Sequence, residues 1–117
     1  MTSGGWLVRL SAAAEADYSA ILRWTAQQFG RRQEASYAKT LAAAVAALTA
    51  GPGIPGARTR PELGEGLYTL HIARGGGRGR HFVLFREREY QGRAAIEVIR
   101  ILHDAMDLAR HLPPEGT

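Results

Sequence analysis

The 117-residue chain contains no cysteine and only one lysine, Lys39. Without cysteine it has no disulfide framework, no thiolate zinc site and no cysteine nucleophile. It also lacks an apolar run near the roughly 18 residues that span a bilayer, and its start shows no signal-peptide pattern. These absences predict a cytoplasmic protein with no membrane segment. The length predicts a single domain over residues 1–117, with a core at about 6–112.

Positive charge of one chemical type is abundant. Fifteen lysine and arginine residues face eleven acidic ones, so the formal net charge is +4, and with Lys39 the only lysine, fourteen cations are arginine. A guanidinium binds carboxylate or phosphate through paired hydrogen bonds, so the composition favours an acidic partner, either a protein or a nucleic acid. A GC-rich genome would also encode few lysines, although that bias explains the net charge less well.

The first half of the sequence predicts one strand and two helices. The apolar run 6–10 is typical of a strand, and Ser11 follows it as a helix N-cap. Helical spacing of apolar residues extends over 12–29 and again over 32–50. The second stretch carries a narrow apolar stripe flanked by alanines, and this stripe includes Tyr37 and Leu41. We therefore expect the two helices to pack as an antiparallel hairpin.

The second half predicts strands after a loop. Glycine and proline residues over 51–66 exclude a helix there, and a charged turn is expected at 87–93. A short last helix is expected over 105–111, with Asp104 as its cap. The fold class is therefore α+β: an N-terminal strand and an antiparallel helical hairpin packed on an antiparallel sheet with a C-terminal three-strand meander. The strand-like runs of that meander are 67–72, 81–86 and 95–103.

The middle run of the meander, His81 to Phe85, is apolar without alternation, although Arg80 and Arg86 flank it. If the first strand joins the meander and the hairpin covers one face, this run lies at the centre of the sheet and is buried on both faces. Its charged ends then lie at the rims of the sheet, where loops present side chains outward.

Four segments in this order resemble the RelE/ParE superfamily of bacterial toxins from toxin–antitoxin modules. They are WLVRLSAAAEADYSAILRWTAQQFG, YAKTLAAAVAALTAGPGIPGARTRPEL, GRHFVLFRE and IEVIRILHDAMDLARHL. The pairing of RHFVLFR with VIRILHDAMD resembles the ParE branch in particular. The resemblance implies a helical hairpin packed on an antiparallel sheet and an acidic antitoxin that wraps the toxin.

The resemblance implies two alternative activities, since ParE-like members inhibit DNA gyrase and RelE-like members cut messenger RNA in the ribosome. We predict a type II toxin that is neutralised by its antitoxin and inhibits gyrase by binding. Operator DNA would be bound only through the antitoxin, in a hetero-oligomer with it. A third reading is a degenerate module that only binds antitoxin. We expect no cofactor, and no metal because His71 and His81 lack acidic or histidine partners at suitable spacing.

An RNA-cutting toxin would need a base, an acid and cations around the phosphate. Arg80, Arg100 and His103 are available for these roles, and His103 matches a histidine that some RNA-cutting members carry near the end of the last strand. Those members place a tyrosine near it, where this chain has Asp104. Structural roles compete, because His103 can bond a local carboxylate or carbonyl and Arg100 can pair with Glu97 or a helix carboxylate. We therefore favour no catalytic residue.

For the antitoxin we expect a helix or strand laid over the hairpin and the sheet edge. Trp24 falls off the main apolar stripe of its helix, so it either anchors a partner or belongs to a second buried face. The expected antitoxin-binding residues are Trp24, Leu41, Val45, Arg86 and Arg100.

Overall fold

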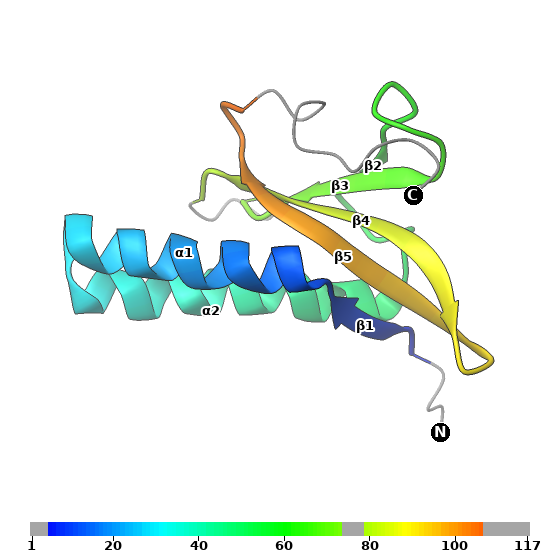
Figure 1. Ribbon diagram of the computed structural model, residues 1–117, viewed down its shortest axis with the longest axis horizontal. Helices are drawn as coiled ribbons and strands as arrows, with labels where there is room; N and C mark the ends of the chain where they lie inside the picture. The colour runs from blue at the N-terminus through cyan, green and yellow to red at the C-terminus, as the bar shows by residue number, and fades with distance from the viewer. Residues whose placement is uncertain (1–4, 74–78, 107–117) are drawn as a thin grey trace.

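The computed structural model describes residues 5–73 and 79–106. Its elements in chain order are β1 (Leu7–Leu10), α1 (Ala12–Phe29), α2 (Arg31–Ala47), the short 3₁₀ turn η1 (Leu48–Ala50), β2 (Ala57–Thr59), β3 (Leu67–His71), β4 (His81–Tyr90) and β5 (Arg93–His103). Figure 1 shows the two helices side by side along one face of a twisted sheet. The predicted α+β fold with an N-terminal strand and a helical hairpin is confirmed.

The predicted last helix, 105–111, lies mostly outside the described residues, and Ala105 and Met106 lie in a turn and a bend. None of the helices in the described ranges is long and apolar enough to cross a membrane.

Local hydrogen bonds explain where α1 begins and ends. The Ser11 hydroxyl accepts from the Ala14 N–H at 3.0 Å and donates to the Ile99 carbonyl at 2.8 Å, so one side chain caps the helix and fastens it to β5. At the other end, Gly30 has φ +90°, a conformation that other residues rarely adopt. Its N–H donates to Ala26 and its carbonyl accepts from Glu34, so this glycine joins the two helices.

The sheet has the strand order β1-β5-β4-β3-β2. β3, β4 and β5 form the predicted antiparallel meander, with β4 at the centre, and β1 lies parallel to β5. β2 was not predicted: its three residues lie within the expected loop and pair with β3, from Ala57 opposite Leu70 to Thr59 opposite Tyr68. This strand has no apolar alternation, because its pattern is half-buried, exposed, exposed.

The charged segment expected to be a turn is mostly strand. β4 continues to Tyr90 and β5 begins at Arg93, so the turn is only Gln91 and Gly92. Both have positive φ, 52° and 77°, as a two-residue hairpin with a type I′ turn requires. The alternating charges therefore belong to an exposed two-stranded ribbon beyond the helices.

The core explains why the middle of β4 is apolar without alternation. Val83, Leu84 and Phe85 are each 0% exposed. Val83 and Phe85 belong to the core cluster under the helical hairpin, which includes Leu41 and Ala44 of α2. Because side chains alternate along a strand, Leu84 lies on the other face of the sheet, where it is also fully buried. The expectation of a central strand buried on both faces is confirmed.

Candidate functional site: a cleft lined by two imidazoles

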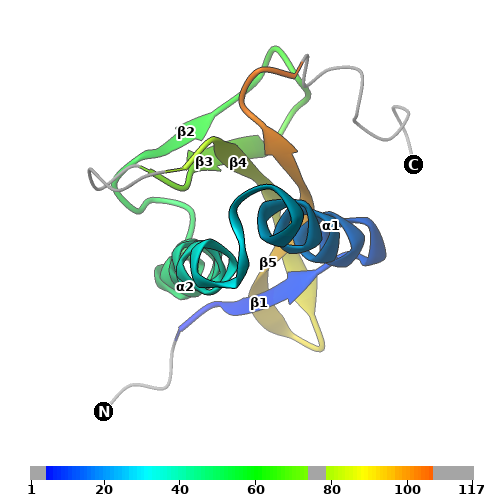
Figure 2. The same cartoon turned by 90° about the vertical axis from the view of Figure 1, so that its left-hand side faces the viewer.

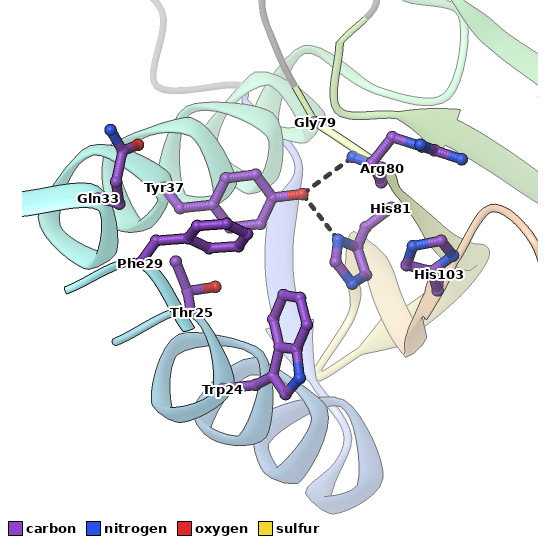
Figure 3. A pocket seen from close by; sticks show the side chains of 9 residues that line it. All are labelled: Trp24, Thr25, Phe29, Gln33, Tyr37, Gly79, Arg80, His81 and His103. Carbon is purple, nitrogen blue, oxygen red and sulfur yellow. Dashed lines mark hydrogen bonds between the residues drawn. The ribbon is translucent and has the colours of Figure 1, made fainter. Parts of the chain in front are cut away.

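Figure 2 looks along the two helices from the end at which α1 turns into α2. A cleft lies where the start of β4 and the end of β5 approach the helical hairpin (Figure 3). It encloses about 670 Å³. We call it the imidazole cleft, because two histidines form one of its walls. Its lining residues are Trp24, Thr25 and Phe29 of α1, Gln33 and Tyr37 of α2, and Gly79, Arg80, His81 and His103 at the sheet.

One wall of the imidazole cleft is aromatic and open to solvent. The Trp24 and Phe29 side chains are 54% and 63% exposed. Their rings meet edge to face, with centroids 5.7 Å apart. Neither ring belongs to the core cluster or to the hydrophobic residues packed on it. Two adjacent large rings left in water beside a cavity are typical of a binding surface.

The floor of the imidazole cleft is a hydrogen-bonded chain. The Tyr37 hydroxyl accepts from the Arg80 backbone N–H at 3.0 Å and lies 2.7 Å from His81 Nδ1. The hydroxyl can donate its own hydrogen to Nδ1, and in that tautomer the neutral His81 ring carries its hydrogen on Nε2. Burial lowers the pKa of His81 to about 4, with His103 lowering it further, so the ring is neutral at pH 7. Burial also raises the pKa of Tyr37, which keeps its hydroxyl protonated.

The second imidazole has the same tautomer. His103 Nδ1 accepts from the Ala105 N–H at 3.0 Å, so the neutral ring carries its hydrogen on Nε2. Its ring lies edge to face with His81, with centroids 5.3 Å apart. His103 is paired directly opposite His81 in the β4–β5 ladder, which is why two residues 22 positions apart in sequence share one wall.

Asp104 fixes the cationic rim of the cleft. Its carboxylate accepts from His71 Nε2 at 3.0 Å and from Arg80 Nε at 3.2 Å. These two hydrogen bonds, with His71 the larger contributor, hold the pKa of Asp104 at about 2. The sequence suggested Asp104 as a helix cap, whereas its carboxylate binds side chains from β3 and the start of β4. Within residues 5–73 and 79–106, no group of three histidine or acidic side chains has the geometry of a metal site.

Two of the three residues considered for RNA cleavage meet in the cleft, and the third does not. Arg80 and His103 both line it. Arg100 instead binds Asp17 of α1 through two bonds, Nε to Oδ2 at 2.8 Å and Nη2 to Oδ1 at 2.9 Å. The same carboxylate accepts the Ile101 backbone N–H at 2.9 Å. Arg100 therefore pairs with a helix carboxylate, which was the structural role considered for it.

The five residues expected to bind antitoxin are spread over several parts of the fold, although Trp24 and Arg100 line one pocket. Trp24 lines the imidazole cleft, and Val45 is half-buried on α2. Arg86 binds Glu97 at 2.8 Å on the β4–β5 ribbon. Leu41 is 0% exposed in the core. The expected contact at Leu41 needs correction, because a side chain sealed between the hairpin and the sheet presents no surface to a partner.

Sequence reasoning did not select Phe29, Tyr37 or His81 for this site. Tyr37 was assigned to the apolar stripe of α2, and its bond to His81 joins residues 44 positions apart. His81 was set aside because it lacked polar partners nearby in sequence. Phe29 gave one usable signal, because a large aromatic residue directly before the helix-ending Gly30 has few neighbours to cover it.

A family model that matches most of the sequence shows which family this chain belongs to. A model of the ParE toxin of type II toxin–antitoxin systems, parDE, matches residues 8–108. The chain belongs to the ParE toxin family. The resemblance to the ParE branch is therefore confirmed. A search of curated proteins found no match.

A solved structure shares the fold of this ParE toxin. It is a chain from a chromosomal ParDE toxin–antitoxin system of P. aeruginosa, with a TM-score of 0.65 and 22% sequence identity. The match covers 86% of the present chain and 98% of the other. At that identity the likeness shows a common fold, and the side chains of the imidazole cleft have to be interpreted from this ParE toxin's own contacts.

Proposed function

We propose that this ParE toxin acts in the cytoplasm by binding DNA gyrase, and that an acidic antitoxin neutralises it by covering the imidazole cleft. The observation that carries the proposal is the exposure of Trp24 and Phe29 beside the cationic Arg80. Aromatic and arginine side chains contribute most to protein interfaces. Gyrase as the target rests on the family resemblance.

Binding rather than catalysis suits the chemistry of the cleft. A nuclease needs a free base next to a free acid. Here His81 Nδ1 is occupied by the Tyr37 hydroxyl, and the Asp104 carboxylate is held by His71 and Arg80. These groups orient one another, and among residues 5–73 and 79–106 no carboxylate lines the cleft to accept a proton from a substrate.

An acidic antitoxin complements the charge of the toxin. The chain carries +4, and Arg80 is exposed at the rim of the cleft. Attraction between opposite charges speeds association, while buried apolar contact at Trp24 and Phe29 slows dissociation. Operator DNA would be reached only through the antitoxin, in a hetero-oligomer of the two proteins.

The RNA-cutting activity is a second candidate, favoured by one observation: Arg80 and His103 line the same cleft. Arg100, the third cation considered for this activity, is paired with Asp17 and lines a neighbouring pocket with His81 and His103.

Purified toxin tests the two candidates directly. We expect it to inhibit supercoiling by gyrase or to trap cleaved DNA, and to leave messenger RNA on ribosomes uncut. The variants Trp24→Ala and Arg80→Gln should weaken inhibition, whereas the matched changes Tyr90→Ala and Arg88→Gln on the β4–β5 ribbon should not. Ribosome-dependent RNA cleavage that disappears in His103→Ala would overturn the gyrase proposal. Normal growth of cells that accumulate folded toxin would instead favour a module that only binds antitoxin.

A further inference from the structure

The sheet side of the imidazole cleft offers hydrogen-bond donors and no free acceptor among the described side chains. His103 accepts at Nδ1 from the Ala105 N–H and so keeps an N–H at Nε2, and neutral His81 keeps one there when the Tyr37 hydroxyl donates to its Nδ1. Arg80 binds Asp104 through Nε, and its two Nη groups bond to none of the described residues. A ligand at this wall must therefore supply acceptors, and an anion supplies the strongest ones.

The Arg80 guanidinium is already oriented for such a ligand. Asp104 holds its Nε at 3.2 Å while 69% of the Arg80 side chain stays exposed. Fixing Nε limits rotation of the planar fork, so less entropy is lost when the Nη groups bind an oxyanion. Asp104 itself is occupied by His71 and Arg80, which reduces its repulsion of the incoming charge.

The helix side of the cleft suits a flat, apolar group. Figure 3 shows Trp24 and Phe29 across the cleft from Arg80, His81 and His103. An exposed indole is a stacking surface for a planar ring. The cleft volume of about 670 Å³ lies in the range of small-ligand pockets. A ligand that fits both walls combines a planar ring with an anionic group of several oxygens.

We propose that the imidazole cleft binds one nucleotide, with its base stacked on Trp24 and edge-on to Phe29, and with its phosphate held by Arg80 and the imidazole N–H groups. Nucleotide binding to the free toxin does not rest on gyrase as the target, although the nucleotide would occupy the same cleft that we propose the antitoxin covers. A phosphate fits the sheet wall better than a carboxylate, because its three terminal oxygens can engage Arg80, His81 and His103 together. A base fits the helix wall better than a branched aliphatic side chain, because it can lie flat on the indole.

Two sources supply this chemistry, a free nucleoside monophosphate and an unpaired nucleotide in a single strand. Titrations of the full chain by calorimetry and by amide chemical shifts would use AMP, GMP, CMP and UMP, and separately single-stranded pentanucleotides. Adenosine tests the base alone, and inorganic phosphate tests the anion alone. We expect nucleotides to bind at least about tenfold more tightly than either part, with shifts at Arg80 and His81. Tighter binding of pentanucleotides than of monophosphates would identify a strand as the source, and equal binding would identify the free nucleotide.

Substitutions locate the site. Trp24→Ala and Arg80→Gln should each weaken nucleotide binding about tenfold. Both side chains are more than half exposed, so folding should survive, and Phe29→Ala gives a second test of the aromatic wall. Tyr90→Ala and Arg88→Gln are the matched controls and should leave binding unchanged.

Several results would overturn the proposal. One is that no nucleotide binds up to about 10 mM. Another is that inorganic phosphate binds as tightly as the nucleotides do. A third is that Trp24→Ala, Phe29→Ala and Arg80→Gln all bind nucleotides as tightly as the unaltered toxin. Saturation of the cleft by a glutamate-rich peptide but not by any nucleotide would assign it to a protein partner alone.

Discussion

The two ends of β4 carry similar residue types and differ in how those residues are paired. We call the C-terminal end of β4, with the ribbon that continues it, the far end. There the Nε atoms of Arg86 and Arg88 lie 2.8 and 3.6 Å from Glu97 Oε1, and the Tyr68 hydroxyl donates to the Glu87 carboxylate at 2.8 Å. We call the N-terminal end of β4, with the imidazole cleft, the near end. There Arg80, His81 and His103 line the cleft, and the Asp104 carboxylate already accepts from His71 and Arg80.

The aromatic side chains differ in the same way. Tyr90 at the far end lies under the Arg9 guanidinium, 3.9 Å from the ring centroid, and is 37% exposed. Trp24 and Phe29 at the near end contact each other and are both more than half exposed. Positive charge alone therefore does not mark a binding site in this protein. We propose that donors without acceptors beside open aromatic rings mark it.

The largest effect is expected at the boundary between the two ends. Phe85 is fully buried and stacks on Tyr68, with ring centroids 5.2 Å apart. Phe85→Ala should lower the free energy of unfolding by about 3–5 kcal/mol, because it removes buried area and leaves a cavity. Tyr90→Ala, on the ribbon, should cost about 1 kcal/mol or less. Urea denaturation measures the free energy of unfolding of both variants. Equal losses would mean that Tyr90 contributes to the core as much as Phe85 does.

A smaller loss is expected at the Asp17–Arg100 pair, where β5 extends past β1. Asp17→Ala removes the acceptor of two guanidinium bonds and of the Ile101 N–H. The side chains of this pair are 15% and 27% exposed, so we expect a loss of about 2–3 kcal/mol in thermal or urea denaturation. A loss below about 0.5 kcal/mol would show that water replaces the carboxylate fully.

The near end should also make stability depend on pH. The pKa of His81 is lowered to about 4 in the fold, whereas an unfolded histidine titrates near 6.5. The unfolded chain therefore binds the proton first, so the contribution of neutral His81 is complete above pH 6.5 and is lost as pH falls toward 4. We expect a loss of about 1 kcal/mol over this window, because solvent screens a partly exposed ring. Denaturation of His81→Gln should show a flatter slope in this window, and an unchanged slope would assign the effect to another group.

The smallest effect belongs to the far end. Arg86 and Glu97 are each about 30% exposed, so their coupling should be within about 1 kcal/mol and should weaken in high salt. A double-mutant cycle with Arg86→Gln and Glu97→Gln measures it. A coupling energy above about 2 kcal/mol would mean that water and salt do not screen this ion pair as they screen an exposed one.

The sequence allowed prediction of the features that depend on local pattern. Apolar spacing gave both helices, Ser11 gave the start of α1, and the run from His81 to Phe85 gave the central strand. β2 escaped prediction because its three residues show no apolar alternation. The ribbon was taken for a turn because alternating charge is typical of both.

The candidate site was only partly predictable for a different reason. The sequence analysis named Trp24 for antitoxin binding, and it named Arg80 and His103 for the alternative RNA cleavage. Their meeting depends on the β4–β5 register and on the contact of Tyr37 with His81 across 44 residues. Leu41 was misjudged as a contact residue because sequence spacing does not tell a core position from a surface one. For Arg100 the sequence offered a helix carboxylate as a partner but could not show that this carboxylate is Asp17.

The most direct test of the near end as the binding end is the affinity of the toxin for its acidic antitoxin, measured by kinetic binding in two double variants. Trp24→Ala with Arg80→Gln alters the near end, and Tyr90→Ala with Arg88→Gln makes the matched changes at the far end. With both variants shown to be folded by circular dichroism, the near-end pair should raise Kd about 100-fold, and the far-end pair should change it by less than about threefold. A far-end pair that weakens binding as much as the near-end pair, or a near-end pair with unchanged Kd, would contradict the assignment of the imidazole cleft as the binding surface.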